Sequence, residues 1–296
     1  MTSVFRKQGQ NMYGVLGATG HVGRAVANTL LAAGQSVTVV TRNPQKAQAW
    51  RQKGASAAVV DVLDTPALAA VFKTVTRVFL LNPPANVAGD TDTEERRSVQ
   101  SILAALEGAS LEKIVLQSTY GAQPGPHCGD LGVLHEFEEG ARALGTPLCC
   151  VRAAYYMSNW VPLAKQAKET GVFSTLLPVD QKVPMVAPED VGVLGAQLLM
   201  SSVEETGLYA CEGPHHYSPR DVAAAFTQVF GRAIHAISIP KADWLAYYQQ
   251  NGFSQQAARS YAHMTELFLE QPCEHSAPLH KGPTDLEAYF RSVFTG

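Results

Sequence analysis

Three glycines near the start of the chain have the spacing of a phosphate-binding turn. Gly17, Gly20 and Gly23 stand three residues apart, after the apolar run Tyr13–Leu16 and before a stretch with helical periodicity. The first glycine permits a tight turn, the second lets backbone approach a pyrophosphate, and the third lets the helix pack on its strand. Ordinary turns also contain glycines, but this turn joins the first strand to the first helix, where free N–H groups favour phosphate. The position predicts dinucleotide binding.

A cation stands where the second strand should end. In sites that prefer NAD, an acidic residue at this place binds the ribose hydroxyls. Here Arg42 follows the strand-like run Ser36–Thr41, and Lys46 lies one helical turn further on. A guanidinium suits the 2′-phosphate of NADP through charge-assisted contacts. The alternative is an exposed arginine without a ligand. The pattern predicts NADP(H) as the cofactor, with NADPH preferred over NADH.

Three further pairs of residues follow the ends of the third, fourth and fifth predicted strands. They are Asp61 with Val62, Asn82 with Pro83, and Ser118 with Tyr120. We expect the first pair at the adenine, the second at the ribose and the third beside the nicotinamide. Each pair could instead be ordinary loop chemistry. The carboxyl ends of parallel strands share one edge of a sheet, and that shared edge favours a functional role.

Apolar runs and helical stretches alternate through the first half of the chain. Strand-like runs lie at Tyr13–Leu16, Ser36–Thr41, Ala57–Val60, Arg77–Leu81, Lys113–Gln117 and Leu148–Arg152. Helical stretches lie near Val22–Ala33, Pro44–Lys53, Pro66–Phe72, Glu94–Gly108 and Leu134–Leu144. This alternation is typical of a parallel sheet covered on both faces. The sequence predicts an α/β protein with a Rossmann-type, doubly wound parallel sheet over residues 12–155.

The second half of the chain, residues 156–296, lacks a regular alternation. It predicts a smaller, mostly helical substrate lobe over the carboxyl ends of the strands, where ligands bind in such sheets. Helices are expected near Met157–Lys168, Asp190–Met200, Pro219–Phe230, Asp243–Gln250, Gln255–Leu269 and Thr284–Phe294, with a strand at Leu208–Cys211. Tyr247, Tyr248 and Phe253 are ordinary packing residues or the wall of a pocket for a flat hydrophobic substrate. Residues 1–11 are expected to be a disordered extension.

Composition argues against several classes of partner. The net charge is −3 and there is no basic tract, so nucleic acid is not an expected partner. The apolar runs are too short to span a bilayer. Five cysteines without CxxC spacing predict reduced thiols and a cytoplasmic location. His215 and His216 lack partners at metal-ligand spacing, so no metal is expected. We expect a small-molecule substrate, and a homo-oligomer is compatible with the sequence.

Several segments resemble the NmrA-like atypical short-chain dehydrogenases. They are GVLGATGHVG from Gly14, the Arg-Asn-Pro after the second strand, VRAAYYMSN from Val151 and VPMVAPEDVG from Val183. The likeness is strongest to the branch with NADPH-dependent quinone and triphenylmethane-dye reductases. It implies a Rossmann domain, NADP(H), and a segment near 183–200 that packs back on that domain. The implied contacts are Gly17, Thr19, Gly20, His21 and Val22 for phosphate, Arg42 for the 2′-phosphate, Asp61 and Val62 for adenine, and Tyr155, Tyr156 and Asn159 for nicotinamide and substrate.

The proton donor departs from the pattern of typical short-chain dehydrogenases. Those enzymes use a Tyr-x-x-x-Lys pair, and no tyrosine here has a lysine four residues later. NmrA-like relatives often place lysine or histidine four residues before a glutamate at the start of the helix after strand five. Counting without gaps puts Leu134 and Glu138 at these positions, whereas a shift of one residue puts His135 there. His135, Tyr155 and Tyr120 are therefore the catalytic candidates, although His135 could also be a surface residue.

Two functions are compatible with these features. The first is an NADPH-dependent reductase that transfers hydride to a small, planar, hydrophobic acceptor such as a quinone, dye, enone, imine or carbonyl compound. The second is a non-catalytic NADP(H)-binding redox sensor, which the missing Tyr-x-x-x-Lys pair would suit. The sequence favours the reductase.

Overall fold

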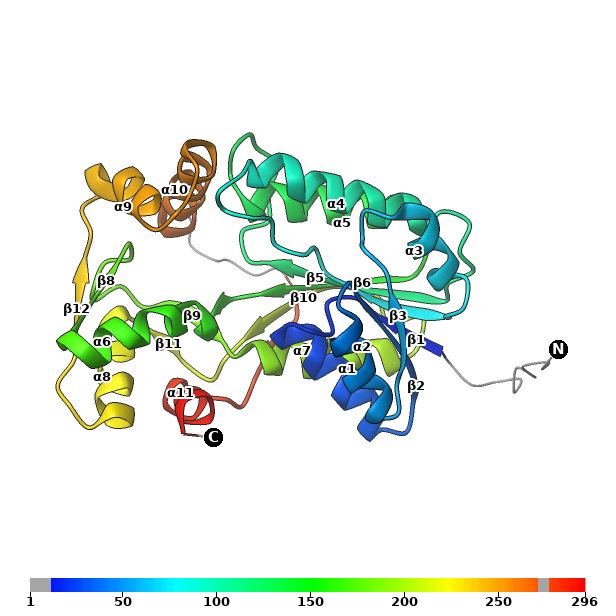
Figure 1. The fold of residues 1–296 in the computed structure, drawn as a ribbon, viewed down its shortest axis with the longest axis horizontal. Coiled ribbons are helices and arrows are strands. Elements are labelled where there is room, and N and C mark those ends of the chain that lie inside the picture. The colour runs from blue at the N-terminus through cyan, green and yellow to red at the C-terminus, as the bar shows by residue number, and fades with distance from the viewer. Residues whose placement is uncertain (1–11, 271–276, 296) are drawn as a thin grey trace.

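The computed structural model describes residues 12–270 and 277–295, and in these ranges eight strands form one central sheet (Figure 1). Their order is β13-β10-β6-β5-β4-β1-β2-β3, and every neighbouring pair is parallel. The strands are β1 (Met12–Val15), β2 (Ser36–Thr41), β3 (Ser56–Val59), β4 (Arg77–Leu80), β5 (Lys113–Thr119), β6 (Leu148–Ala153), β10 (Gly207–Glu212) and β13 (Leu279–Lys281). The predicted Rossmann-type fold is confirmed.

The winding of the sheet changes direction next to β1. From β1 the chain moves outward to β2 and β3, and then crosses back so that β4 lies on the other side of β1. The crevice outside the carboxyl ends of the strands at such a switch point is where open α/β sheets bind ligands. The residues after β1, β2, β3 and β4 therefore share one candidate binding edge.

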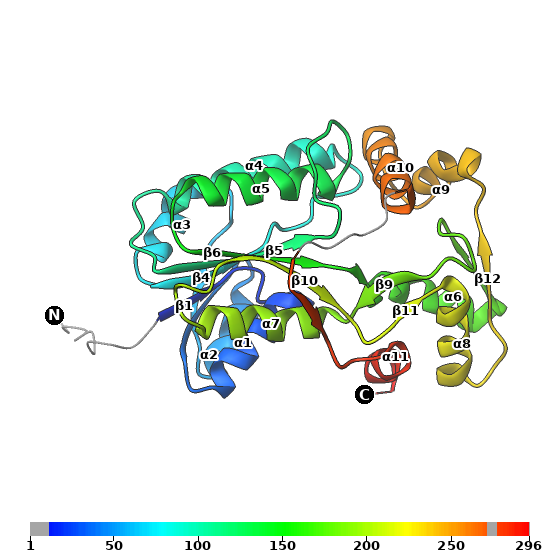
Figure 2. The same cartoon turned by 180° about the vertical axis from the view of Figure 1, so that it is seen from behind.

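Helices cover both faces of the sheet. Figures 1 and 2 show α3, α4 and α5 on one face and α1, α2 and α7 on the other. These helices are α1 (His21–Ala32), α2 (Pro44–Gln52), α3 (Thr65–Phe72), α4 (Thr91–Leu106), α5 (Asp130–Ala143) and α7 (Pro188–Met200). Asn43, Asp64 and Asp90 cap α2, α3 and α4 through their side chains, which satisfies backbone N–H groups that a helix start leaves unpaired.

The core has one layer on each face of the sheet. Cys149 and Cys150 are neighbours on β6, and their side chains belong to different layers, because successive side chains of a strand alternate. The central strands are apolar on both faces, as β4 with four buried residues illustrates. This double burial fixes the sheet rigidly under the binding edge.

The remaining elements form the lobe at one end of the sheet (Figure 2). They are β7 (Tyr155–Tyr156), the 3₁₀ helix Met157–Leu163, α6 (Ala164–Thr170), β8 (Val172–Thr175), β9 (Val183–Val186), β11 (His216–Tyr217), α8 (Pro219–Phe230), β12 (His235–Ser238), the 3₁₀ turn Lys241–Asp243, α9 (Trp244–Gln250), α10 (Gln255–Glu270) and α11 (Leu286–Phe294). An aromatic cluster holds the lobe, with Phe226 in contact with Phe173 and Phe290. Ser218 caps α8 with a capping box.

The sheet does not end at residue 155. Both β10 and β13 lie beyond that boundary and extend the sheet from β6. Helix α7 also returns to the sheet, and its Gly192 lies so close to α1 that a Cβ there would be 2.5 Å from the Cβ of Ala25. The parallel edge of β6 would otherwise expose unpaired backbone groups, and the later strands cover it. Among the described residues, the lobe therefore comes mainly from 155–186, 216–270 and 286–294.

The N-terminal segment and the possibility of a membrane-spanning helix were also considered in the sequence. Residues 1–11, expected to be a disordered extension, lie outside the described residues. Within the part of the chain that the structure does describe, no helix is both long and apolar enough to cross a membrane.

Candidate functional site

The glycine turn after β1 has the geometry that a dinucleotide pyrophosphate requires. Gly17 has a φ of +69°, a conformation that favours glycine. A Cβ on Gly23 would lie 2.4 Å from the carbonyl oxygen of Gly17, so the helix packs tightly on the turn. A Cβ on Gly20 would meet only that oxygen, at 3.5 Å, so open space lies in front of Gly20. The three glycines thus have the three separate roles that their spacing predicts.

The start of α1 offers backbone donors beside this open space. Its N-cap is Gly20, and no side chain caps it, so the N-terminal N–H groups can receive a phosphate. Thr19 and His21 are exposed at the turn, whereas Val22 is buried and packs the helix on the sheet. The imidazole Nδ1 of His21 lies 3.3 Å from Glu189 Oε1. The turn residues carried over from the family resemblance are therefore gathered at one point.

Arg42 and Lys46 lie on the solvent side of the same edge. Both side chains are exposed, and the structure records no hydrogen bond or ion pair for either side chain among the described residues. Asn43 holds the local backbone by accepting the N–H of Lys46 at 2.9 Å. Two exposed cations at the end of β2 fit a bound 2′-phosphate, because a guanidinium and an ammonium both donate to phosphate oxygens.

The ends of β3 and β4 carry the next candidates. Asp61 accepts the N–H of Leu63 at 3.0 Å, which shapes the loop beside the half-buried Val62. Asn82 and Pro83 follow β4, and Asn82 Oδ1 is buried with no hydrogen-bond partner among the described residues. A buried polar atom without a partner is costly. A ligand hydroxyl group in the crevice would satisfy it.

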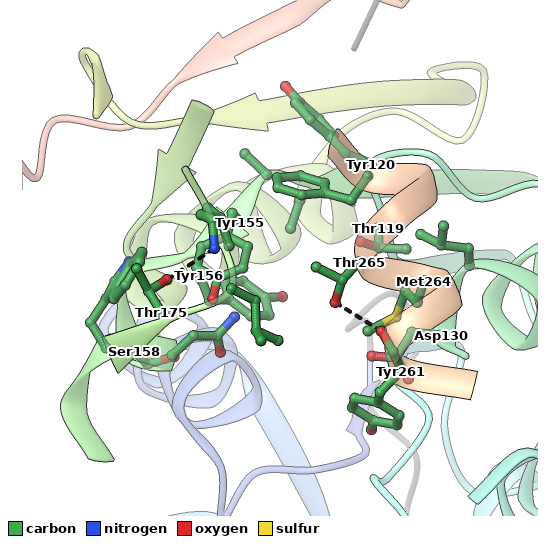
Figure 3. Close-up of a pocket in the computed structure, with 18 of the residues that line it drawn as sticks. Thr119, Tyr120, Asp130, Tyr155, Tyr156, Ser158, Thr175, Tyr261, Met264 and Thr265 are labelled. Atoms are coloured by element: carbon green, nitrogen blue, oxygen red, sulfur yellow. Dashed lines mark hydrogen bonds between the residues drawn. The ribbon is translucent and has the colours of Figure 1, made fainter. Parts of the chain in front are cut away.

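A cavity of about 560 Å³ lies between the sheet and the lobe. One wall is the end of β5 with Ser118, Thr119 and Tyr120, and another is the start of α5. Figure 3 shows Tyr155, Tyr156, Ser158 and Thr175 on one side, and Asp130, Tyr261, Met264 and Thr265 on the other. Most of the lining is apolar or aromatic, which favours a flat, hydrophobic ligand. Tyr247, Tyr248 and Phe253 belong to it, so they are wall residues as well as packing residues.

Three of the tyrosines expected at the nicotinamide and substrate line this cavity. They are Tyr120, Tyr155 and Tyr156, and the exposed Asn159 joins them. Tyr155 hydrogen-bonds to Asn159 and packs its ring against Trp160 and Phe268. Burial raises the pKa of Tyr155 and that of Tyr156 well above the usual value of a tyrosine. Such hydroxyls stay protonated at neutral pH and are weak acids.

A buried ionic network supports the floor of the cavity under Ser118. The Ser118 hydroxyl donates to Glu138 Oε1 at 2.5 Å, and Arg152 donates to both carboxylate oxygens of Glu138 at 2.8 and 2.7 Å. Glu138 is 1% exposed, so its charge depends on Arg152. Glu138 therefore fixes the rotamer of Ser118 on β5 and joins α5 to β6.

The structure does not bring His135 to the cavity. Leu134 and Asp130 line it from α5, whereas His135 is half-buried and does not. Leu131 and Leu134 are three residues apart and share the face of α5 that lines the cavity, and the lining does not include His135. The gap-free count, with Leu134 and Glu138 at the family positions, agrees with this arrangement. The shifted alignment that placed His135 at the nicotinamide does not.

Three acidic residues that the sequence analysis did not select lie at the cavity wall or behind it, and Asp130 is the one that lines the cavity. Asp130 is the first residue of α5, and Glu95 and Asp92 come from α4. Asp92 accepts the Ser260 hydroxyl at 2.6 Å and thereby holds α10 against α4. Burial and the charge of Asp130 raise the pKa of Glu95 to about 8. The only sequence signal for this cluster was the presence of acidic residues on the buried face of α4. Asp130 was missed because α5 was expected to start near Leu134, which left Asp130 in a loop.

No cluster of three histidine, cysteine or acidic side chains with metal-binding geometry occurs among residues 12–270 and 277–295. His216 instead pairs with Glu212 at 3.1 Å.

A glycine turn at a switch point, a cation after β2 and a separate aromatic cavity together define a dinucleotide-binding Rossmann protein with its own ligand pocket. The profile of the NmrA-like family matches residues 11–290, and the chain belongs to this family. The resemblance stated from the sequence is confirmed.

Relatives and solved structures agree with this placement. A (4-alkanoyl-5-oxo-2,5-dihydrofuran-3-yl)methyl phosphate reductase of Streptomyces griseus is 30% identical over 225 residues, 74% of each chain. Quinone oxidoreductase 2 of Escherichia coli is 25% identical over 240 residues, 79% of this chain and 80% of that one. The structure of a Citrobacter triphenylmethane reductase complexed with NADP(H) superposes with a TM-score of 0.78 at 18% identity, covering 96% of this chain and all of the other. The last likeness concerns the fold.

Proposed function

We propose that the protein is an NADPH-dependent reductase that acts on a small, planar, hydrophobic acceptor. The observation that carries the proposal is the cavity of about 560 Å³, whose aromatic lining meets the carboxyl ends of β5 and β6. In a parallel sheet of this winding, the nicotinamide end of a dinucleotide bound across β1 and β4 reaches that place. Two relatives support the proposal by their names, which are quinone oxidoreductase 2 and (4-alkanoyl-5-oxo-2,5-dihydrofuran-3-yl)methyl phosphate reductase.

The residues at the binding edge would hold the cofactor in sequence along the sheet. The α1 N-terminus and Gly20 take the pyrophosphate, while Arg42 with Lys46 takes the 2′-phosphate. The remaining contacts are Asp61 and Val62 at the adenine, Asn82 and Pro83 at the ribose, and Ser118 and Tyr155 at the nicotinamide. NADPH, when bound, supplies the hydride.

The cavity residues would position the acceptor. Tyr156 and Tyr120 form walls for its flat face, and Asn159 offers an amide at the rim beside Tyr155. Burial of the reacting atoms under α9 and α10 excludes water and strengthens the polar contacts that remain. Quinones, cationic dyes, enones and imines fit these walls because each is planar and accepts hydride into a delocalised π-system.

The experiment is NADPH oxidation, followed by its absorbance, against a panel of quinones, cationic triphenylmethane dyes, enones and imines. Turnover with at least one class, and with NADPH well above NADH, is the expected result. A protein that binds NADPH tightly but oxidises it with no acceptor of the panel would be a sensor instead. Binding measured by calorimetry in parallel separates that result from a misfolded preparation.

A further inference from the structure

Two carboxyl groups meet at the wall of the cavity that faces Tyr156. Asp130 lines the cavity (Figure 3), and Glu95 lies behind it on the second turn of α4 with an exposed fraction of 4%. Their side chains hydrogen-bond to each other. A carboxylate can only accept hydrogen bonds, so this contact requires one proton between the two groups.

The surroundings keep that proton in place. Among the described residues, the structure records no ion pair for Asp130 or Glu95, while Arg96 and His127 lie 3.6 and 3.7 Å from Asp92. The titratable or charged groups that face the pair are Asp92 and Arg96 on α4, His127 and Cys128 in the loop before α5, Tyr261 on α10 and Tyr156 on β7. Burial and the charge of Asp92 raise the pKa of both Asp130 and Glu95.

The other end of the pair is fixed. The backbone N–H of Ala85 donates to Glu95 Oε1 at 3.1 Å, which holds the carboxyl group on the loop after β4. Asp130 begins α5, and the helix dipole there stabilises negative charge. Glu95 therefore holds the shared proton. Asp130 accepts it and lines the cavity, so the proton can pass to a ligand through Asp130.

A ligand is indicated independently on the facing side of the cavity. The hydroxyl of Tyr156 is buried and has no hydrogen-bond partner among the described residues, and the charge of Asp130 contributes to its raised pKa. A buried hydroxyl without a partner calls for a polar ligand atom. An acceptor whose oxygen or nitrogen sits between Tyr156 and Asp130 would satisfy it.

Asp130 is also the one carboxyl group among the described residues that line the cavity, and the other titratable lining groups are tyrosines. No lysine is present there to lower a tyrosine pKa, and burial raises the pKa of Tyr155, Tyr156 and Tyr261. A proton needed near neutral pH comes more readily from a carboxyl pair than from such hydroxyls.

We propose that the carboxyl pair is the general acid of this reductase: Glu95 holds the proton, and Asp130 passes it to the acceptor. The role rests on the proposed function. When the acceptor gains hydride, negative charge forms on its oxygen or nitrogen. The Glu95 O–H bond breaks as the proton moves to Asp130. The Asp130 O–H bond then breaks as the new O–H or N–H bond forms on the acceptor, and two carboxylates remain until water returns one proton. The acceptor thus gains two electrons and two hydrogens.

The proposal separates two classes of acceptor. A neutral quinone becomes an anion on hydride addition and needs a proton. A cationic triphenylmethane dye becomes neutral on hydride addition and needs none. Dye reduction is therefore a control for quinone reduction. Both reactions use the same cavity and the same hydride donor, but only quinone reduction uses the carboxyl pair.

The experiment measures NADPH-dependent turnover of a neutral quinone and a cationic triphenylmethane dye by the wild type, Asp130→Asn and Glu95→Gln. Asp130→Asn should lose about a hundredfold or more of kcat with the quinone, in the range of general acid catalysis, and no more than about threefold with the dye. The wild-type quinone rate should fall above about pH 8 while the dye rate does not. Glu136→Gln is the control variant, because it removes a carboxylate from the exposed side of α5, the helix that Asp130 begins. It should change neither rate.

The outcomes separate the two proposals. Equal losses with both acceptors in Asp130→Asn, or an unchanged quinone rate, would overturn the acid role and leave the reductase intact. A wild type that reduces neither acceptor would overturn the proposed function. The shared proton is then checked alone by the infrared band of a protonated carboxyl group. The band is expected at neutral pH in the wild type and shifted in frequency in both variants, because each variant removes one partner of the hydrogen bond. A wild type without this band would also overturn the inference.

Discussion

The dinucleotide edge and the aromatic cavity of this protein are built in different ways. The phosphate turn lies within the seven residues from Gly17 to Gly23. A side chain at Gly17 or Gly23 would clash with close neighbours, and Gly20 leaves open space. The cavity instead gathers β5, the start of α5, the segment after β6 and the hairpin of α9 and α10. The backbone geometry of a local turn follows from its own few residues. The chemistry of the cavity wall depends on which residues from distant segments contact each side chain.

The same contrast applies to charge. Arg42 is exposed and has no recorded partner among the described residues, so its role follows from its position after β2. The raised pKa values of Asp130 and Glu95 result from burial and from the contact between them, and neither can be inferred from the residue types. We therefore expect variants at the edge to act on binding and variants at the cavity to act on turnover.

The largest effect is expected from Gly20→Val. Its side chain would occupy the open space that the pyrophosphate needs, and no neighbouring group would have to move in the free protein. NADPH binding should fall below detection by calorimetry while the melting temperature stays close to that of the wild type. Gly23→Val is the matched control, because its side chain meets the Gly17 carbonyl at 2.4 Å or less and should destabilise the fold itself. Micromolar NADPH binding by Gly20→Val would contradict the assignment.

Arg42→Ala should have the next largest effect, and it should be selective. A hydrogen bond to a charged group contributes roughly 1.5–3 kcal/mol, so NADPH affinity should fall about ten- to a hundredfold. NADH lacks the 2′-phosphate and should bind as before. Calorimetric titration of both cofactors measures the difference. Equal losses for NADPH and NADH would show that Arg42 supports the fold or contacts another part of the dinucleotide.

The regular elements of the fold could be predicted because their patterns are local. The strand Ser36–Thr41 and the helix Pro219–Phe230 have the bounds that the sequence indicates. The short strands of the lobe could not be predicted, because runs of two or four residues have no periodicity to detect. Their partners are distant, as in the pairing of β8 with β12, where Val172 lies opposite His235.

The start of α5 shows how tertiary contact changed the site. Helical periodicity indicated a start near Leu134, but the helix begins one turn earlier, at Asp130. The preceding Gly129 has a φ of +54°, and its N–H donates to Ser260 on α10 at 3.0 Å. A residue 131 positions away therefore helps to set the start of the helix. Asp130 consequently faces the cavity, which sequence reasoning could not foresee.

A smaller effect is expected in the pH dependence of stability, and it tests the assembled side of the comparison. Glu95 loses its proton near its ordinary pKa of 4.5 in the unfolded chain and near 8 in the folded protein. Between these values unfolding releases a proton, so the contribution of Glu95 to stability is present below pH 4.5 and is lost as pH rises through 8. Glu95→Gln has no such dependence.

The measurement is urea unfolding of the wild type and Glu95→Gln between about pH 5 and pH 8, where one pKa unit corresponds to roughly 1.4 kcal/mol. Relative to the wild type, the variant should gain stability at each step upward, by at most about that amount per pH unit. Comparing the two proteins cancels the titrating groups that do not interact with Glu95, so the difference reports on Glu95 together with Asp130. A constant difference across the range would mean that Glu95 titrates alike in both states, and the shared proton would then be excluded.

The smallest effect is expected from His135→Ala. Leu134 rather than His135 lines the cavity, and the Nδ1 atom of His135 is buried without a hydrogen-bond partner among the described residues. Its removal should break no recorded contact with the ligand wall, so turnover should stay within about twofold of the wild type at every pH. Leu134→Ala is the matched control, since it enlarges the cavity and should raise KM for the acceptor. A hundredfold loss of turnover in His135→Ala with unchanged NADPH affinity would identify His135 as a proton donor. In that case α5 would have to rotate when the cofactor binds. The cavity lining would then depend on the cofactor-binding edge, and the two regions could not be treated as separate.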